Sequence, residues 1–189
     1  GQSYIGGVLF VQWLKEAFKK YPKHQWILVD PYLDEIGLQL LSSAGSCSIH
    51  FDVVTTEQTG APDRNEGWRA RLQAAGRAFC QHTRARLQLY ILKDKAIHDR
   101  YLWIEDNDGE VIEGFHLSNS LQGATQLYPL LITPIPKDVL RQVQQYVSDK
   151  KKRSQKRPMI FDAKDVVVLL INPIDQLMAF PHIGEILSE

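Results

Sequence analysis

A short turn signal, Asn107-Asp108-Gly109, most constrains how this chain can fold. It stands between two β-rich runs, residues 98–106 and 111–117. Asp-Gly tolerates the positive φ angles of a tight hairpin loop, so we predict two adjacent antiparallel strands joined by Asp108-Gly109 as a two-residue loop.

The loop also fixes which residues of the two strands face each other. Counting back from Asp108-Gly109 places Leu117 opposite Arg100 and Asn119 opposite His98, within about one or two positions. Side chains alternate along a strand, so His98 and Arg100 lie on the same face. One end of the hairpin therefore gathers an imidazole, a guanidinium and the polar cluster Ser118 to Ser120.

Strands and helices alternate before the hairpin and continue after it. Apolar spacing and β-branched runs predict helices over 7–20, 33–41 and 66–82, and strands over 25–30, 48–56 and 86–93. After the hairpin we predict a strand over 129–135, a helix opened by Pro136 and ended by the basic run 150–157, and a buried strand over 165–171. This order predicts an α/β fold in which a mixed β-sheet is covered by helices on both faces.

Length and composition favour one self-sufficient domain over residues 1–189. No apolar run approaches the ~18 residues of a membrane span and the N-terminus lacks a signal-peptide pattern, so we expect a soluble, cytoplasmic protein. Two cysteines, Cys47 and Cys80, predict free thiols in a reducing compartment. Lys plus Arg and Asp plus Glu both number 22, so any contact with a polyanion must come from a local patch.

The polar residues at the hairpin suit phosphodiester chemistry. An imidazole at His98 can act as a nucleophile or a base, and a guanidinium at Arg100 is a permanent cation for nonbridging oxygens. Ser118 and Asn119 add small groups that can orient a phosphate.

These residues resemble the motifs of the phospholipase D superfamily. His98-x-Arg100-x-x-x-x-Glu105 stands in place of His-x-Lys-x-x-x-x-Asp, and 114–119 in place of the Gly-Ser/Thr-x-x-Asn element. Residues 26–32, ending in Asp-Pro-Tyr, are similar to the opening strand of prokaryotic members. The resemblance covers about 25–136 and is nearest to a divergent, defence-associated branch; it implies a phospholipase D-like half-domain, followed by a C-terminal helix and strand over 137–189.

The resemblance implies a metal-independent phosphodiesterase without a cofactor. His98 would attack phosphorus and form a phosphohistidine, Arg100 would hold the phosphate, and Ser118 and Asn119 would bind or orient it. Glu105 or Asp106 would fill the acidic position. Family members need two motifs and this chain has one, so the resemblance implies a homodimer in which a second His98 is the general acid.

Three residues depart from the family pattern. Arg100 replaces lysine with a bidentate fork, Glu105 is longer than aspartate, and Phe115 stands where serine is expected. These changes fit either a specialised enzyme or a fold that has lost activity.

Further residues are candidates for substrate binding, each with a structural alternative. Asp30 could lie at the site rim or simply cap the next helix, and His116 could be a metal ligand but is better read as a hydrogen-bonded hairpin histidine, so we predict no metal site. The basic run is either a solvated helix end or a nucleic-acid patch. The substrate-binding candidates are Asp30, Tyr32, His116, Ser120, Lys150, Lys151, Lys152 and Arg153.

Two functions follow from the sequence. The first is a phosphodiesterase. A nuclease is favoured over a lipase because the sequence shows no membrane-binding surface. The alternative is a catalytically degenerate module that binds nucleic acid or dimerises within a larger, defence-related protein or complex. The motifs leave the choice among DNA, RNA, nucleotide and lipid open.

Overall fold

The computed structural model describes residues 7–45, 49–57, 67–93, 97–125, 130–154 and 157–163. Its helices are α1 (Gly7–Lys20), α2 (Glu35–Ser42), α3 (Trp68–Thr83) and α4 (Lys137–Arg153), with a 3-10 helix η1 (Leu121–Thr125). Its strands are β1 (Gln25–Val29), β2 (His50–Thr56), β3 (Arg86–Leu92), β4 (Tyr101–Glu105), β5 (Val111–Leu117), β6 (Ile132–Pro134) and β7 (Met159–Phe161).

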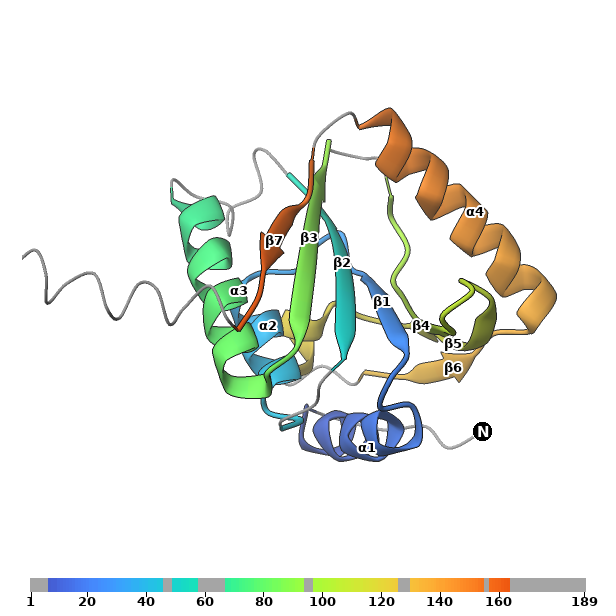
Figure 1. The fold of residues 1–189 in the computed structure, drawn as a ribbon, viewed down its shortest axis with the longest axis horizontal. Helices are drawn as coiled ribbons and strands as arrows, with labels where there is room; N and C mark the ends of the chain where they lie inside the picture. Colours follow the sequence, from blue (N-terminus) through green and yellow to red (C-terminus); the bar gives the residue numbers. More distant parts are fainter. Residues whose placement is uncertain are drawn as a thin grey trace, which may run out of the picture.

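The strands form one mixed sheet of seven in the order β6-β5-β4-β1-β2-β3-β7. The central strands β1, β2 and β3 are parallel, and the strands on either side are antiparallel to their neighbours. Helices α2 and α3 lie on the opposite side of this sheet from α4 (Figure 1). The predicted fold class, an α/β mixed sheet with helices on both faces, is confirmed, and it is consistent with a phospholipase D-like half-domain.

Two apolar clusters cover the two faces of the sheet. Trp26 and Leu28 of β1 join the larger cluster, which packs against α1, α2 and α3. Ile27 and Val29 join the smaller one, which packs beneath α4. A strand buried on both faces needs an uninterrupted apolar run, and this is why β1 lacks polar alternation.

Helix α4 packs closely on β5 because Gly114 has no side chain. A Cβ atom at this position would overlap the Leu140 side chain and lie 2.9 Å from Cβ of Trp103. Leu140 and Trp103 are both buried in the smaller cluster. The glycine in β5 is therefore a packing requirement of the helix on that face.

The hairpin between β4 and β5 has a longer loop than predicted. The amide of Asp106 donates to Glu110 O at 3.0 Å, so three residues, not two, form the loop. Gly109 has φ 80°, and the Asp106 carboxylate accepts from the amides of Asp108 and Glu110, both at 2.9 Å. The predicted two-residue loop is wrong because Asp106 organises the turn through its own side chain.

A β-bulge restores the predicted strand register despite the different loop. Glu105 pairs with Val111 but Ile104 pairs with Glu113, so β5 holds one extra residue, Ile112. The extra loop residue and the bulge compensate each other. Leu117 N donates to Arg100 O at 3.0 Å, so Leu117 lies opposite Arg100 as predicted.

Most other predicted elements are present with shifted ends. The strand predicted over 129–135 is shortened to β6, while β7 and η1 were not predicted. The strand predicted over 165–171 lies outside the described residues, as does Cys47. Cys80 is buried, forms no disulfide among the described residues, and its thiol donates to Phe161 O at 3.5 Å. Within the described ranges, no helix is long and apolar enough to cross a membrane.

Replacement of Gly114 by alanine tests the packing of α4. The added methyl group must displace Leu140 or Trp103, and such overpacking costs about 1–3 kcal/mol of unfolding free energy. Urea denaturation measures the loss. Adding Leu140→Val should recover part of it, whereas two strictly additive losses would contradict this contact.

Candidate functional site

Three polar segments meet at one edge of the sheet. Asp30 directly follows β1, Arg100 directly precedes the antiparallel β4, and the polar residues 118–120 directly follow β5. Because β4 is antiparallel to β1 and β5, its beginning lies beside their ends. The carboxyl ends of parallel strands, where chain connections diverge, commonly form ligand sites in α/β proteins.

Asp30 is fully buried and its carboxylate accepts three hydrogen bonds. Oδ1 accepts from the amide of Tyr32 at 3.1 Å, and Oδ2 accepts from Ser120 Oγ at 2.8 Å and from the amide of Leu121 at 2.9 Å. Asp30 does not cap the next helix, because Asp34 is the N-cap of α2. A buried Asp30 is placed to position its neighbours and not to contact substrate itself.

The turn that follows Asp30 is attached to the end of β2. The carbonyl oxygen of Pro31 accepts from the hydroxyls of Thr55 at 3.3 Å and Thr56 at 2.9 Å. Both threonines are buried, so these bonds satisfy groups that water cannot reach. The turn is consequently fixed to two neighbouring strands.

Burial raises the pKa of Asp30 above its ordinary value of 3.8. The hydrogen bonds from Leu121, Ser120 and Tyr32 act in the opposite direction and lower the pKa, as does the positive charge of Arg100. These groups favour the ionised carboxylate against the cost of desolvation.

Arg100 lies next to Asp30 but does not form an ion pair with it. Continuing the register of Val29 with Tyr101 by one residue puts Asp30 beside Arg100, and the guanidinium carbon lies 5.0 Å from the centre of the Tyr32 ring. Among the described residues no ion pair joins Arg100 to an acid, and its buried Nε has no hydrogen-bond acceptor. The guanidinium thus lies between the charge of Asp30 and the ring of Tyr32, and it has no ion pair with any described residue.

His98 lies two residues before Arg100 at the exposed rim of this edge. Within the described part of the chain its imidazole makes no hydrogen bond. The intervening Asp99 is also exposed and accepts from the Tyr101 hydroxyl at 3.3 Å. His98 is therefore open to a ligand approaching from solvent.

The polar cluster after β5 is largely organised by its own contacts. Ser118 Oγ accepts from the amide of Leu131 at 2.9 Å, and Ser120 is buried with its hydroxyl on Asp30. The Asn119 carboxamide oxygen accepts from the amide of Ser120 at 2.9 Å, which leaves its NH2 group as the donor. Asn119 is consequently the better ligand-binding candidate, and Ser120 is a structural residue.

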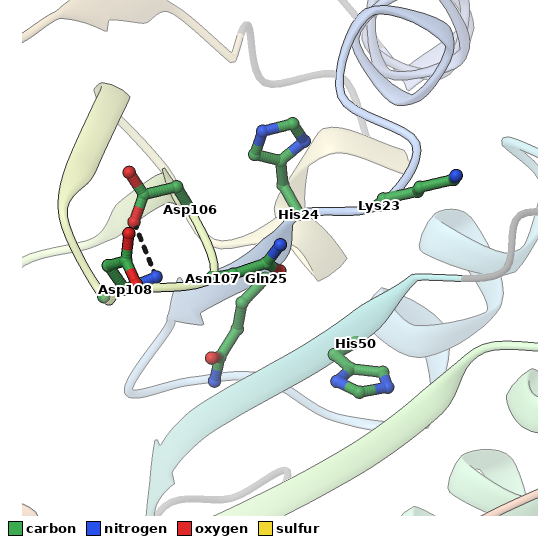
Figure 2. Close-up of a pocket in the computed structure, with 8 residues that line it drawn as sticks. Lys23, His24, Gln25, His50, Asp106, Asn107 and Asp108 are labelled. Carbon is green, nitrogen blue, oxygen red and sulfur yellow. Dashed lines mark hydrogen bonds between the residues drawn. The ribbon is translucent and has the colours of Figure 1, made fainter.

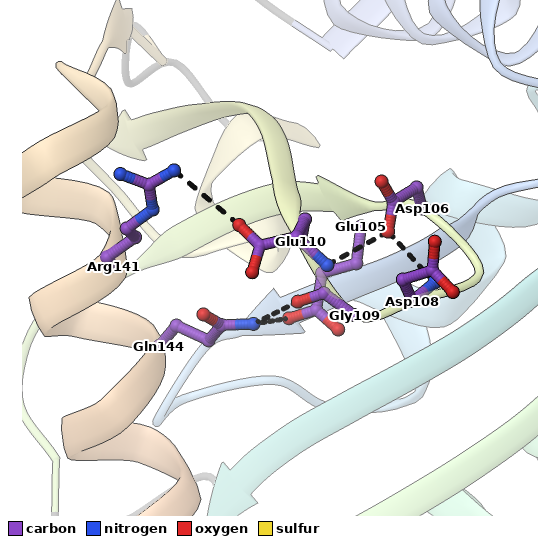
Figure 3. A network of polar contacts seen from close by, with 7 residues as sticks. All are labelled: Glu105, Asp106, Asp108, Gly109, Glu110, Arg141 and Gln144. Atoms are coloured by element: carbon purple, nitrogen blue, oxygen red, sulfur yellow. Dashed lines mark hydrogen bonds and ion pairs between the residues drawn. The ribbon is translucent and has the colours of Figure 1, made fainter.

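Glu105 lies at the opposite end of β4 from Arg100, roughly 16 Å away along an extended chain. Its carboxylate accepts from Trp103 Nε1 at 2.7 Å and from Gln144 Nε2 at 2.8 Å. Gln144 also donates to Gly109 O at 2.9 Å and so ties α4 to the hairpin loop (Figure 3). The structure gives Glu105 a role in packing and does not bring it to His98.

His116 lies on the other face of the sheet from Arg100. It pairs with Tyr101 in the β4–β5 register, and the two rings meet edge to face with centroids 5.9 Å apart. Tyr101 packs against the cluster beneath α4. In the described ranges no group of three or more His, Cys, Asp or Glu side chains could hold a metal ion.

The basic residues at the end of α4 have different environments. Lys151 Nζ forms an ion pair of 2.8 Å with Asp52 and lies 3.8 Å from the centre of the Tyr90 ring. Lys150 lies over the ring of Tyr146 at 5.1 Å. Lys152 and Arg153 are exposed, so only part of this run is available to an external partner.

A polar pocket of ≈ 470 Å³ lies at the other edge of the sheet, away from Arg100. Its side chains do not converge on one point: in Figure 2 His24 and His50 point in opposite directions, and Lys23 points away from both. The residues come from three distant segments, so only the strand pairing could have revealed the pocket. Its lining is Lys23, His24, Gln25, His50, Asp106, Asn107, Asp108 and Gly109.

Comparisons with known proteins leave the family of this chain open. No family model matches the sequence, and no curated protein matches it. Among solved structures the chain is similar to a polyphosphate kinase from Porphyromonas gingivalis, with 13% identity and a TM-score of 0.38 over 93% of this chain. It spans 29% of that protein's length. At this score the likeness carries no argument about activity.

Replacement of Lys151 by alanine should lower stability much more than the same change at Lys152. Without Lys151, the Asp52 side chain, only 7% exposed, keeps its charge without its partner, which costs about 3–5 kcal/mol of unfolding free energy. The exposed Lys152 should change stability by no more than about 0.5 kcal/mol. Equal losses in chemical denaturation of the two variants would contradict this assignment.

Proposed function

We propose that this protein is a metal-independent phosphodiesterase that cleaves nucleic acid. The observation that carries the proposal is Arg100, whose guanidinium lies beside Asp30 and over Tyr32 and forms no ion pair among the described residues. An arginine in this state suits the nonbridging oxygens of a phosphate. The exposed His98 two residues away supplies a nucleophile at the same rim.

In the proposed reaction a ring nitrogen of His98 attacks phosphorus. The bond from phosphorus to the leaving oxygen breaks, a general acid protonates that oxygen, and a phosphohistidine remains. Water then attacks the same phosphorus, the N–P bond breaks, and the imidazole is regenerated. Arg100 and the NH2 group of Asn119 would stabilise the charge on the nonbridging oxygens in both steps.

A homodimer would supply the general acid. Glu105 is too far from His98 to protonate the leaving oxygen, and one chain offers one such histidine. A two-fold axis that brings together the exposed rims of two copies would place a second His98 on the far side of the phosphorus. Each histidine could then serve as nucleophile or acid.

Nucleic acid is the proposed substrate because exposed cations stand at the end of α4. Lys152 and Arg153 are exposed and carry no ion pair among the described contacts, so they can neutralise backbone phosphates. Lys151 is excluded from this role by its bond to Asp52.

A non-catalytic nucleic-acid-binding module is the second candidate. It is favoured by one observation: within the described residues no carboxylate orients the His98 imidazole. A histidine without such a partner is a weaker nucleophile. This alternative keeps the Arg100 phosphate contact but has no chemical step.

Cleavage assays on single- and double-stranded DNA and RNA, with EDTA present, test the proposal. His98→Ala should lower the cleavage rate by at least about 10³-fold, because the nucleophile is lost. The matched control is His82→Ala, an exposed histidine on α3, which should cleave at the parental rate. Cleavage that persists in His98→Ala, or a parent that binds nucleic acid without cutting it, would rule out the enzymatic reading.

A further inference from the structure

We propose that Asp30 is a positioning residue that assembles the anion site from both sides, holding the loop after β5 through hydrogen bonds and Arg100 through its charge. This inference rests on the proposed function, because it assumes that Arg100 receives an anion. Asp30 itself is fully buried and would never touch that anion.

The two carboxylate oxygens of Asp30 serve two different parts of the chain. Oδ1 accepts from Tyr32 in its own turn and so fixes the ring that lies against Arg100. Oδ2 accepts from Ser120 and Leu121, which follow Asp30 by 90 and 91 residues. One side chain thus joins the ring under the guanidinium to the loop that carries Asn119.

Arg100 forms no ion pair with Asp30 among the described residues. The three hydrogen bonds take three of the roughly four lone-pair positions of the Asp30 carboxylate, and the positive charge of Arg100 acts on it without a direct bond. Asp52 gives the contrasting arrangement on the opposite face: its Oδ2 accepts from Lys151 at 2.8 Å, and that lysine is consumed by the pair. The two buried aspartates therefore differ in their contacts: Asp52 forms an ion pair with Lys151, and among the described contacts Asp30 forms none with Arg100.

Replacement of Asp30 by asparagine would keep the size of the side chain but not its function. An amide has one acceptor oxygen, and its NH2 group would face either the Tyr32 amide or the two donors from Ser120 and Leu121. It also carries no charge to balance Arg100. Both halves of the site should loosen, although no residue predicted to touch the anion has changed.

The experiment compares Asp30→Asn with Asp52→Asn in the full chain. Asp52 is the matched control because it is also a buried aspartate in this sheet, but it faces α4. Tungstate, a phosphate mimic, is titrated by calorimetry, and the Arg100 Nε–H signal is followed by ¹⁵N NMR without ligand. Asp30→Asn should weaken tungstate binding about 10- to 100-fold and speed exchange of the Nε–H, since misplacing a site by about 1 Å has effects of this size.

Asp52→Asn should bind tungstate within about twofold of the parent, since additivity holds between distant sites. Ser120→Ala removes one of the three bonds and should weaken binding in the same direction but less. Parental affinity and parental Nε–H exchange in a folded Asp30→Asn would overturn the inference, as would an equal loss in Asp52→Asn. If Asp30→Asn does not fold, Ser120→Ala decides, and unchanged affinity and exchange there would overturn it.

The NMR readout separates this inference from the proposed function. Should tungstate fail to bind the parent, the phosphate-binding proposal falls. Faster Nε–H exchange in Asp30→Asn would still show that Asp30 positions Arg100, because that signal requires no ligand.

Discussion

The buried carboxylate of Asp30 is the contact on which the arrangement of the candidate site depends. Its three hydrogen bonds connect the end of the central strand β1 with the loop after β5. Thr55 and Thr56 of β2 fix the same turn from the other side. Three strands of the sheet are consequently locked together at the edge where Arg100 enters β4.

Burying a carboxylate costs free energy, and the fold compensates for it in two ways on its two faces. Asp52 is compensated by direct pairing with Lys151, which attaches α4 to the sheet. Asp30 is compensated mainly by neutral donors, with Arg100 acting at longer range. Breaking either set leaves a desolvated charge behind, so both are expensive to remove. Of these two aspartates, only Asp52 forms an ion pair with its neighbouring cation among the described residues, and this asymmetry distinguishes the two faces.

Local patterns predicted the sheet and helices well because they are encoded within short stretches. The apolar run of β1, the spacing of α1 and the turn before Gly109 each carry their own signal. The hairpin loop is nevertheless one residue longer than predicted. A bulge at Ile112, which no local sequence pattern indicates, restores the predicted register. The register correctly placed Leu117 opposite Arg100. His98 and Asn119 lie just outside β4 and β5, and their roles at the site stay a prediction.

The roles of residues that contact distant parts of the chain could not be predicted from local sequence patterns. Asp30 was predicted either to lie at the site rim or to cap the next helix, because its bonds to Ser120 and Leu121 join residues 90 and 91 positions apart in the sequence. Glu105 matched a motif position by spacing, but its partners Trp103 and Gln144 hold it at the wrong end of β4. In the sequence Lys151 cannot be distinguished from its neighbours in the basic run. Only the packing of α4 on the sheet brings it to Asp52.

The most direct test of the account is a crystal structure of the protein soaked in tungstate. We expect the anion at the edge formed by β1, β4 and β5, within hydrogen-bonding distance of the Arg100 guanidinium and the Asn119 amide. Tungstate bound instead in the pocket near Lys23 and His24, with the Arg100 edge empty, would contradict the central claim that this edge is built to hold a phosphate.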